Sequence, residues 1–141
     1  MAGKEVRIRT GRKIERRDVT GEVAGAVEAL AIREGFVVVS VPHTTAAVTV
    51  GENWDPDVGT DLERALSAWV PGVRFDHGEG NSPAHFLSEA IGNSRLVPVE
   101  GGKLRLGRWQ GIFFLELDGP RERVLRVDPL GPAALDTDRP V

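Results

Sequence analysis

Residues 36–50, FVVVSVPHTTAAVTV, contain two runs of strand-forming residues separated by a proline and a histidine. The run 36–41 is rich in valine, which is typical of a strand buried on both faces. After Pro42, residues 45–50 alternate in a way that predicts a second strand, because successive side chains of a strand point to opposite faces. The stretch therefore predicts two central strands with His43 between them.

The sequence on either side of this stretch predicts the remaining elements. Alternation and apolar periodicity predict further strands at 5–9, 13–16, 96–99, 104–106, 112–117 and 123–127, and helices at 20–34, 56–70 and 83–91. Gly35, Pro71-Gly72 and Gly92 are the expected helix stops. The order ββαββααββββ predicts a single α+β domain with mostly antiparallel sheets and about three helices.

Two local patterns support this order. Asp55 and Ser82 each precede a proline, which is the expected start of a helix: a side-chain cap followed by proline in the first turn. The turns 100–102 and 118–120 predict two hairpins, 96–106 and 112–127. We expect the domain to occupy residues 1–130 and the tail 131–141 to be loose.

Composition excludes several classes of protein. The chain has 141 residues with 18 Lys plus Arg, 21 Asp plus Glu and a net charge of -3, so a nucleic-acid partner is not expected. It has no cysteine, which excludes disulfides, thiolate metal sites and a cysteine nucleophile. It shows neither a run of about 20 apolar residues nor the apolar core of a signal peptide. We therefore expect a cytoplasmic protein without a membrane partner.

The three histidines are the main candidates for chemistry. His43 lies between the central strands, His77 in a loop and His85 in the first turn of the third predicted helix. Polar residues surround them: Thr44, Thr45, Glu79, Gly80 and Asn81. If the imidazoles converge, they could bind a divalent metal and leave a fourth position open for water or substrate. The alternative is three unrelated surface histidines.

Two further segments carry polar residues at the ends of strands. Residues 51–55 place Glu52, Asn53 and Asp55 between a strand and a helix, a usual location for ligand contacts. Asp55 is explained by its capping role, whereas no structural role is expected for Glu52 or Asn53. The segment 107–111 places Arg108, Trp109 and Gln110 between glycines, where a tight turn with a packing tryptophan is the alternative.

These segments together resemble the signatures of the YjbQ family, small proteins described as secondary thiamine-phosphate synthases. The first match is 43–50 (HTTAAVTV), followed by Glu52-Asn53 and 55–58 (DPDV). The second is 77–85 and the third is 107–112 (GRWQGI), in the family's order. The resemblance covers roughly 37–127. Arg108 stands where the family usually has threonine or serine.

The resemblance implies an α+β fold, a homotrimer with polar clefts near subunit boundaries, and one polar site that contains all three histidines. It implies a transferase that joins hydroxymethylpyrimidine diphosphate to a thiazole phosphate and releases pyrophosphate, as a secondary activity. The partner would then be a small phosphorylated metabolite. From the three imidazoles themselves, a divalent metal, zinc or magnesium, is the candidate cofactor.

We accordingly expect the following roles. The candidate catalytic residues are His43, Glu52, Asn53, His77 and His85. The candidate substrate-binding residues are Thr44, Thr45, Asp55, Glu79, Asn81, Arg108, Trp109 and Gln110. The candidate metal ligands are His43, His77 and His85. A metal-dependent hydrolase of a phosphorylated or carbonyl substrate and a non-catalytic trimeric binding module remain alternatives.

Overall fold

The structure is a computed structural model that describes residues 2–130. Its elements follow the predicted order. In chain order they are β1 (Lys4–Arg9), β2 (Glu15–Asp18), α1 (Thr20–Ala29), β3 (Gly35–Ser40), β4 (Ala46–Glu52), α2 (Pro56–Ala68), α3 (Ser82–Ile91), β5 (Ser94–Glu100), β6 (Lys103–Leu104), β7 (Gln110–Glu116) and β8 (Glu122–Leu130). The predicted α+β class with three helices is thus confirmed. The predicted tail lies outside the described residues.

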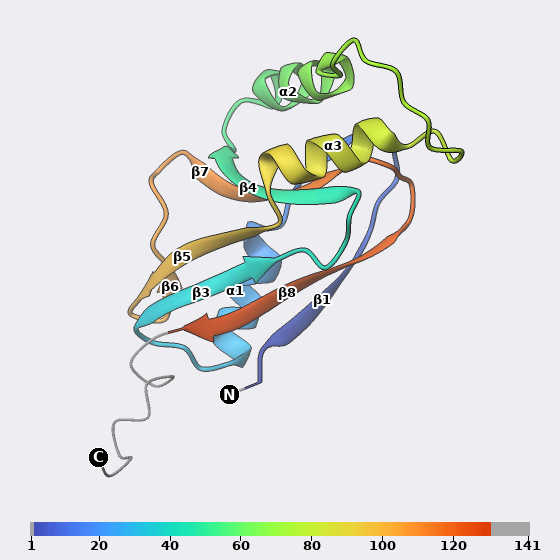
Figure 1. The fold of residues 1–141 in the computed structure, drawn as a ribbon. Helices are drawn as coiled ribbons and strands as arrows, with labels where there is room; N and C mark the ends of the chain where they lie inside the picture. Colours follow the sequence, from blue (N-terminus) through green and yellow to red (C-terminus); the bar gives the residue numbers. More distant parts are fainter. Residues whose placement is uncertain (1, 131–141) are drawn as a thin grey trace.

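Two antiparallel sheets form the body of the molecule. One has five strands in the order β1-β8-β3-β5-β6, and the other has three in the order β2-β7-β4. The three-stranded sheet is the middle layer, with the five-stranded sheet on one side and α2 and α3 on the other (Figure 1). Helix α1 contacts strands of both sheets, so it closes one side of the space between them.

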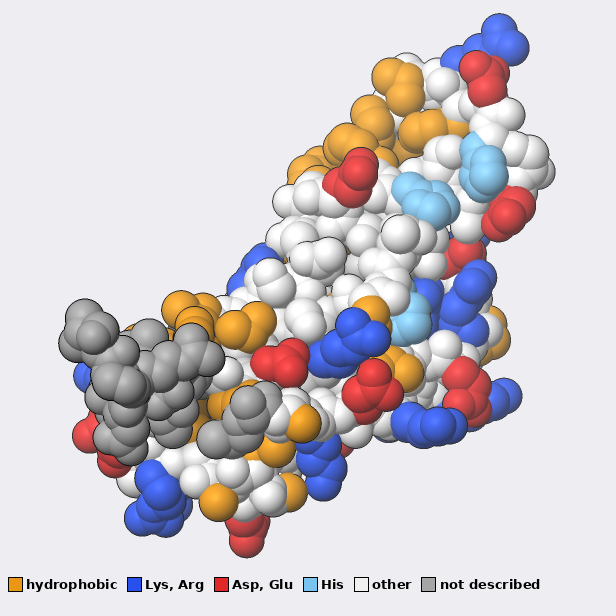
Figure 2. All heavy atoms as spheres, turned by 60° about the horizontal axis from the view of Figure 1, so that its bottom comes forward, with side chains coloured by type: hydrophobic (Ala, Val, Ile, Leu, Met, Phe, Trp, Pro, Cys, Tyr) orange, Lys and Arg blue, Asp and Glu red, His pale blue; other side chains and the backbone are white. Residues whose placement is uncertain are grey.

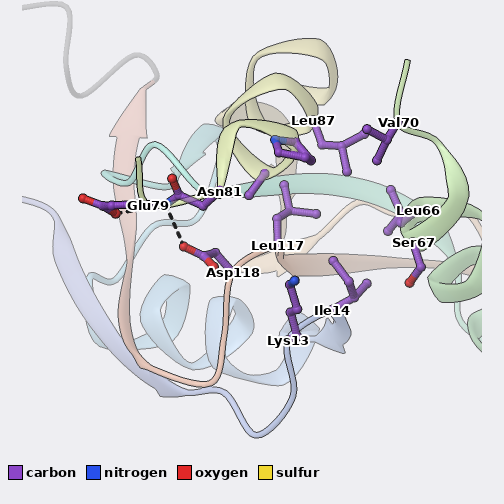
Figure 3. A pocket seen from close by; sticks show the side chains of 13 residues that line it. Lys13, Ile14, Leu66, Ser67, Val70, Glu79, Asn81, Leu87, Leu117 and Asp118 are labelled. Carbon is purple, nitrogen blue, oxygen red and sulfur yellow. Dashed lines mark hydrogen bonds between the residues drawn. The ribbon is translucent and has the colours of Figure 1, made fainter. Parts of the chain in front are cut away.

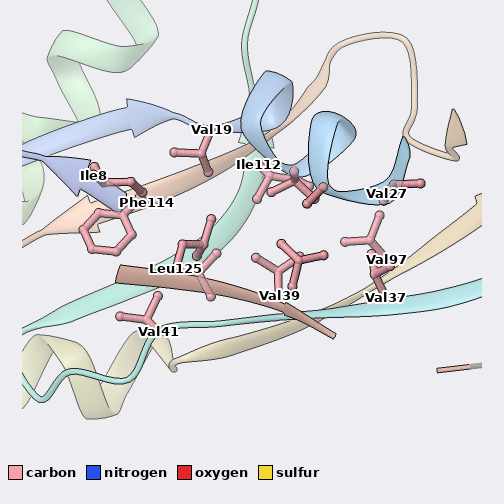
Figure 4. Packing of buried hydrophobic residues seen from close by; sticks show 14 of the residues in the cluster. Ile8, Val19, Val27, Val37, Val39, Val41, Val97, Ile112, Phe114 and Leu125 are labelled. Carbon is pink, nitrogen blue, oxygen red and sulfur yellow. The ribbon is translucent and has the colours of Figure 1, made fainter. Parts of the chain in front are cut away.

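The main core fills the space between the sheets and α1 (Figure 4). Strand β7 shows how the layers are built, because its side chains alternate between two apolar clusters. Ile112 and Phe114 belong to the core between the sheets, whereas Phe113 and Leu115 pack on the α3 side. Both faces of β7 are buried, so this strand packs against the five-stranded sheet on one side and against α3 on the other.

Helix α2 differs most from its expected packing. The stripe Val58, Leu62, Ala65, Leu66 and Trp69 predicts an inward apolar face, yet no residue of α2 is buried. The helix ends at Ala68 rather than just before Pro71. Large apolar side chains are exposed along α2, the segment that follows it and α3, and we call them the apolar ridge: Leu62, Trp69, Val70, Val73, Phe75 and Phe86. Trp69 and Phe86 pack edge to face, with ring centroids 6.2 Å apart.

Three other predictions about the chain path are wrong. Helix α1 ends at Ala29 instead of Glu34, because Ala31 takes a left-handed conformation (φ 54°) that stops the helix. Asn81, not Ser82, is the N-cap residue of α3. The turn 118–120 does not close a hairpin: β7 and β8 belong to different sheets, so this turn carries the chain from one sheet to the other. The predicted hairpin at 100–102 is confirmed by the pairing of β5 with β6.

The two connections between the sheets run side by side. The β1–β2 connection meets the β7–β8 connection through Thr10 N–H donating to the Arg121 carbonyl (3.0 Å) and Gly119 N–H donating to the Lys13 carbonyl (3.0 Å). Beneath them lies a buried ion pair between Glu116 and Arg123, whose exposed fractions are 0% and 4%. The chain therefore crosses between the sheets over a pair of opposite charges.

The two threonines that bind this ion pair, Thr10 and Thr45, lie far from it along the chain. Arg123 donates from Nε to the Glu116 carboxylate (3.0 Å) and from Nη2 to the Thr45 carbonyl (3.0 Å) and hydroxyl (2.9 Å). Thr10 donates its hydroxyl to Glu116 (2.6 Å), and Leu117 N–H donates to the same carboxylate (3.0 Å). Burial raises the pKa of Glu116, but the hydrogen bonds from Arg123 and Thr10 outweigh it and hold the pKa below its usual value.

Among residues 2–130, no helix is long and apolar enough to cross a membrane.

Breaking the buried ion pair from one side should be costly. We expect Arg123→Met to lower the free energy of unfolding by about 3–5 kcal/mol, because Glu116 would be left as an unpaired buried charge. The double variant Arg123→Met/Glu116→Met should recover part of this loss. Arg9→Ala, which removes an exposed pair with Glu122, should cost less than about 1 kcal/mol. Urea unfolding of the four proteins measures this, and a single variant as stable as Arg9→Ala would contradict it.

Candidate functional site

His43 is held in one orientation and one tautomer. It lies in the connection between β3 and β4, and its Nε2 accepts the backbone N–H of Val124 (2.9 Å). In the neutral ring the proton is therefore on Nδ1. Burial lowers the pKa of His43, and the positive charge of Arg123 lowers it further. His43 is thus a neutral imidazole whose remaining ring nitrogen is an N–H donor.

His43 and His85 line one polar cavity of about 400 Å³, which we call the histidine cavity. This volume suits a small molecule. Its lining residues are His43, Thr44, His85, Ser88, Glu89, Gly92 and Asn93. Ser88 donates its hydroxyl to the Ala46 carbonyl (2.7 Å), which fixes α3 on the start of β4. The cavity therefore sits between α3 and the connection that carries His43.

His77 stands next to this cavity. Its ring packs edge to face against that of His85, with centroids 6.0 Å apart. Figure 2 shows the three histidine side chains on one face of the molecule, two of them close together. Residues 2–130 contain no group of three or more His, Asp or Glu side chains placed to hold a metal ion. His43 Nε2 is also already occupied by Val124. The predicted three-histidine metal centre is therefore not formed by the described part of the chain.

Glu79 and Asn81 line a second cavity on the other side of α3, with a volume of about 350 Å³ (Figure 3). Asn81 Nδ2 donates to Asp118 (2.9 Å) and to Glu79 (3.4 Å). These two acceptors fix which end of the amide carries the nitrogen. Lys13 and Leu117 line the same cavity. Glu79 and Asn81 thus contribute to a cavity neighbouring that of His43.

Thr45 is also placed differently from its expected role. Its side chain is buried, and its hydroxyl accepts a hydrogen bond from Arg123 (2.9 Å). The predicted substrate contact is therefore replaced by a structural one, since the hydroxyl is used inside the protein. Thr44, in contrast, is exposed and lines the histidine cavity.

The remaining candidates gather at the opposite end of β4. Glu52 is paired with Gln110 across β4 and β7, and Asn53 N–H donates to the Trp109 carbonyl (3.0 Å). Trp54 and Trp109 pack edge to face with centroids 4.8 Å apart, and the Arg108 guanidinium lies 4.7 Å from the Trp109 ring centroid. We call Trp54, Arg108 and Trp109 the tryptophan cluster. Strand β4 separates it from the histidine cavity by about 20 Å, at about 3.3 Å per residue.

Several residues of this end have local structural roles. Asp55 accepts the Asp57 N–H (2.9 Å), which confirms it as the cap of α2. Glu52 accepts the Asp55 N–H (3.0 Å), so the expectation that Glu52 has no structural role is wrong. Gln110 accepts the Gly107 N–H (2.8 Å), which closes the turn that was the alternative interpretation of this segment.

Several cavity residues lie outside the motifs singled out in the sequence. Ser88 and Glu89 follow His85 by three and four positions on a helix, so they share its face, and this spacing could have revealed them. Asn93 directly follows the predicted helix stop Gly92 and could have been considered with it. Lys13 and Asp118 meet the 79–81 segment only through the packing of the two connections between the sheets. No local sequence signal brings these two together.

The fold and site together define an α+β protein of two antiparallel sheets with a histidine-lined cavity at one end of a central strand. The family model described as "UPF0047 protein YjbQ-like" matches residues 4–132, and the chain belongs to this family.

Relatives and solved structures agree with this assignment. A UPF0047 protein of Methanocaldococcus jannaschii is 42% identical over 125 residues, which cover 88% of this chain and 91% of the relative. The UPF0047 protein YugU of Bacillus subtilis is 42% identical over 130 residues, covering 91% and 98%. A crystal structure of a YjbQ/UPF0047 family protein from Clostridium acetobutylicum superposes with a TM-score of 0.85 at 41% identity, covering 90% of this chain and 99% of that chain. None of these names states a reaction.

The lowered pKa of His43 predicts a loss of stability in mild acid. The unfolded chain protonates this histidine as the pH falls through about 6.5, whereas the folded protein keeps it neutral to lower pH. The unfolded state then binds more protons, so the free energy of unfolding falls with pH in this range. His43→Gln retains an acceptor for Val124 N–H but cannot titrate, so its loss should be smaller. Urea unfolding of the wild type and of His43→Gln at about pH 7.5 and about pH 5.5 measures both losses of unfolding free energy. Equal losses in the two proteins would refute the lowered pKa of His43.

The cap of α2 gives a second test of the local roles. Asp55→Ala should lower the free energy of unfolding by about 1 kcal/mol, because the first turn loses its side-chain acceptor. Glu52→Gln keeps an amide oxygen for the Asp55 N–H and should change it by less than about 0.5 kcal/mol. Thermal unfolding of both variants measures this. A larger loss for Glu52→Gln than for Asp55→Ala would show that the charge of Glu52 is itself needed for folding.

Proposed function

We propose that the histidine cavity binds a small phosphorylated metabolite and transfers a carbon group from it with loss of diphosphate, as in a thiamine-phosphate synthase-like transferase acting as a secondary activity. One observation carries the proposal: a neutral, oriented His43 and a second histidine, His85, face one polar cavity of about 400 Å³. Groups of this kind donate hydrogen bonds or protons to a leaving oxygen.

The proposed reaction balances as follows. The C–O bond between the pyrimidine methylene and the diphosphate breaks, and its electron pair leaves with the diphosphate. The thiazole nitrogen donates its lone pair to the methylene carbon and forms the new C–N bond. The protein has to stabilise the negative charge that develops on the leaving oxygen. The Nδ1–H of His43 and the imidazole of His85 are the candidate donors, and His77 supports the orientation of His85.

The residues around the histidine cavity also bear on the two alternative functions, a metal-dependent hydrolase and a non-catalytic binding module. A metal-dependent hydrolase would need the three-histidine centre, which residues 2–130 do not form. A non-catalytic binding module needs only the cavity, so turnover has to distinguish it from the transferase. We further propose that the chain acts as a homotrimer. The apolar ridge supports this proposal, because contiguous exposed apolar surface on a small protein often marks an interface.

Turnover of the two proposed substrates tests the function. With hydroxymethylpyrimidine diphosphate and thiazole phosphate together, we expect release of diphosphate and formation of thiamine phosphate. His85→Gln should reduce the rate by about 10²-fold or more, because the amide of glutamine cannot give a proton to the leaving oxygen. Glu28→Gln, on the exposed side of α1, is the matched control and should retain the rate.

The outcomes separate the three functions. The hydrolase would be favoured if the pyrimidine substrate released phosphate or diphosphate without the thiazole phosphate, at the rate measured with both substrates. Binding of the substrate without release of either product would favour the binding module. An unchanged rate for His85→Gln would remove the histidine cavity from the reaction.

A further inference from the structure

An apolar cavity of about 340 Å³ lies between α2 and the three-stranded sheet, and we call it the α2 cavity. Its opposite wall includes Val50 of β4 and Leu115 of β7. Its helix wall is one face of α2, with the spacing of an apolar stripe: Leu62, Ala65, Leu66 and Trp69. The apolar face predicted for α2 is thus turned toward the sheet without closing on it.

Polar contacts, rather than apolar packing, hold α2 in place. Glu63 accepts the backbone N–H of Arg16 (2.9 Å) and a hydrogen bond from the guanidinium of Arg12 (2.9 Å). These contacts tie the helix to β2 and to the turn before it, whereas no residue of α2 is buried. Water beside such a stripe finds few hydrogen-bond partners, so an apolar group that displaces it gains free energy.

One cation, Arg16, lines this apolar cavity. Its guanidinium carbon lies 3.5 Å from the centroid of the Phe113 ring, and its Nη2 donates to the Glu52 carbonyl (2.8 Å). A Cβ on Gly51 would lie 2.8 Å from the same nitrogen, so glycine at this point of β4 leaves room for the guanidinium. The charged group is therefore held at the wall of the cavity.

Within residues 2–130, Arg16 forms no ion pair. Three carboxylates lie close enough to act on its charge: Asp18, Glu52 and Glu63. Each of them accepts a hydrogen bond from another group: Asp18 from Thr20, Glu52 from Asp55, and Glu63 from Arg12. Burial lowers the pKa of Arg16, because the protein removes part of the water around the charge. A cation in this position favours an anion that enters the cavity.

The dimensions of the cavity favour a long and narrow ligand. Along α2, Leu62 and Trp69 are separated by about 10 Å, at about 1.5 Å per residue. The guanidinium lies near the start of this stripe, since a Cβ on Gly59, in the turn before Leu62, would lie 3.6 Å from Arg16 Nη1. The cavity thus has a cation at one end and an indole at the other, with apolar walls between them.

We infer that the α2 cavity binds a free carboxylic acid with an unbranched apolar chain, its carboxylate paired with Arg16 and its chain lying along α2 toward Trp69. Arginine pairs well with carboxylates, because its planar group can donate two parallel hydrogen bonds. A phosphate head group carries a charge near −2 and three acceptor oxygens, which need more donors than this cation offers. The α2 cavity shares no lining residue with the histidine cavity, so the inference is independent of the proposed function.

Octanoate and its uncharged analogue 1-octanol test the site by isothermal titration calorimetry on the full chain. Arg16→Gln should weaken octanoate binding by about tenfold or more, because the ion pair is lost, and should change octanol binding by less than about twofold. Arg17→Gln is the matched control: Arg17 points to the other face of β2 and does not line the cavity, so both affinities should be retained. Octanoate should also bind more tightly than butyrate, by up to about fourfold per added methylene.

A second pair of variants tests the apolar part of the cavity. Ala65→Leu enlarges a side chain of the cavity wall and should weaken the binding of both ligands by about tenfold or more. Ala68→Leu, on the same helix but outside the lining, should bind both as the wild type does. Both alanines are exposed, so these variants should fold, and they decide the question if Arg16→Gln does not fold.

Three results would overturn the inference. The first is the absence of octanoate binding by the wild type, which is the outcome expected if side chains of a second copy fill the α2 cavity. The second is equal octanoate binding by the wild type and a folded Arg16→Gln. The third is equal weakening by Ala65→Leu and Ala68→Leu, or weakening by neither. None of these results bears on turnover at the histidine cavity.

Discussion

The buried ion pair between Glu116 and Arg123 lies where the chain passes from one sheet to the other, and the positions of both sheets depend on it. Its two charges are satisfied by Thr10 and Thr45, which lie far from it along the chain. An ion pair contributes little net stability when its desolvation is counted, but it is very sensitive to its geometry. Its main effect is therefore to fix how the two connections between the sheets lie together.

The same network positions the candidate site. Thr45 is two residues after His43, and Val124, which donates to the His43 ring, directly follows Arg123. The orientation of the histidine is thus fixed by the residue that follows Arg123, and Arg123 also binds Thr45 near the histidine. The positive charge of Arg123 also contributes to keeping the imidazole neutral. A change in the crossing of the sheets would move the histidine and alter its charge together.

Local patterns were enough to predict the element order, because valine-rich runs, proline after a capping residue and glycine turns each act over a few residues. These patterns failed where contacts between residues far apart in the sequence determine the structure. The turn 118–120 has the residues of a hairpin, but β7 and β8 pair with strands of different sheets. The periodicity of α2 predicts an apolar face without showing what covers it. Likewise, the motifs identified the histidines and the 107–111 segment, but only the direction of β4 shows that they lie at opposite ends of one strand.

The pairing of β1 with β8 has a consequence for how the protein is made. The first strand, Lys4–Arg9, has its partner at Glu122–Leu130, so it stays without a neighbour until β8 has left the ribosome. The central strand β3 also takes one of its two partners from β8. Folds dominated by such distant pairings form slowly, because loop-closure entropy is lost before the contacts compensate for it. Completion of the larger sheet consequently waits for the synthesis of β8, and until then the nascent β1 and β3 present open edges.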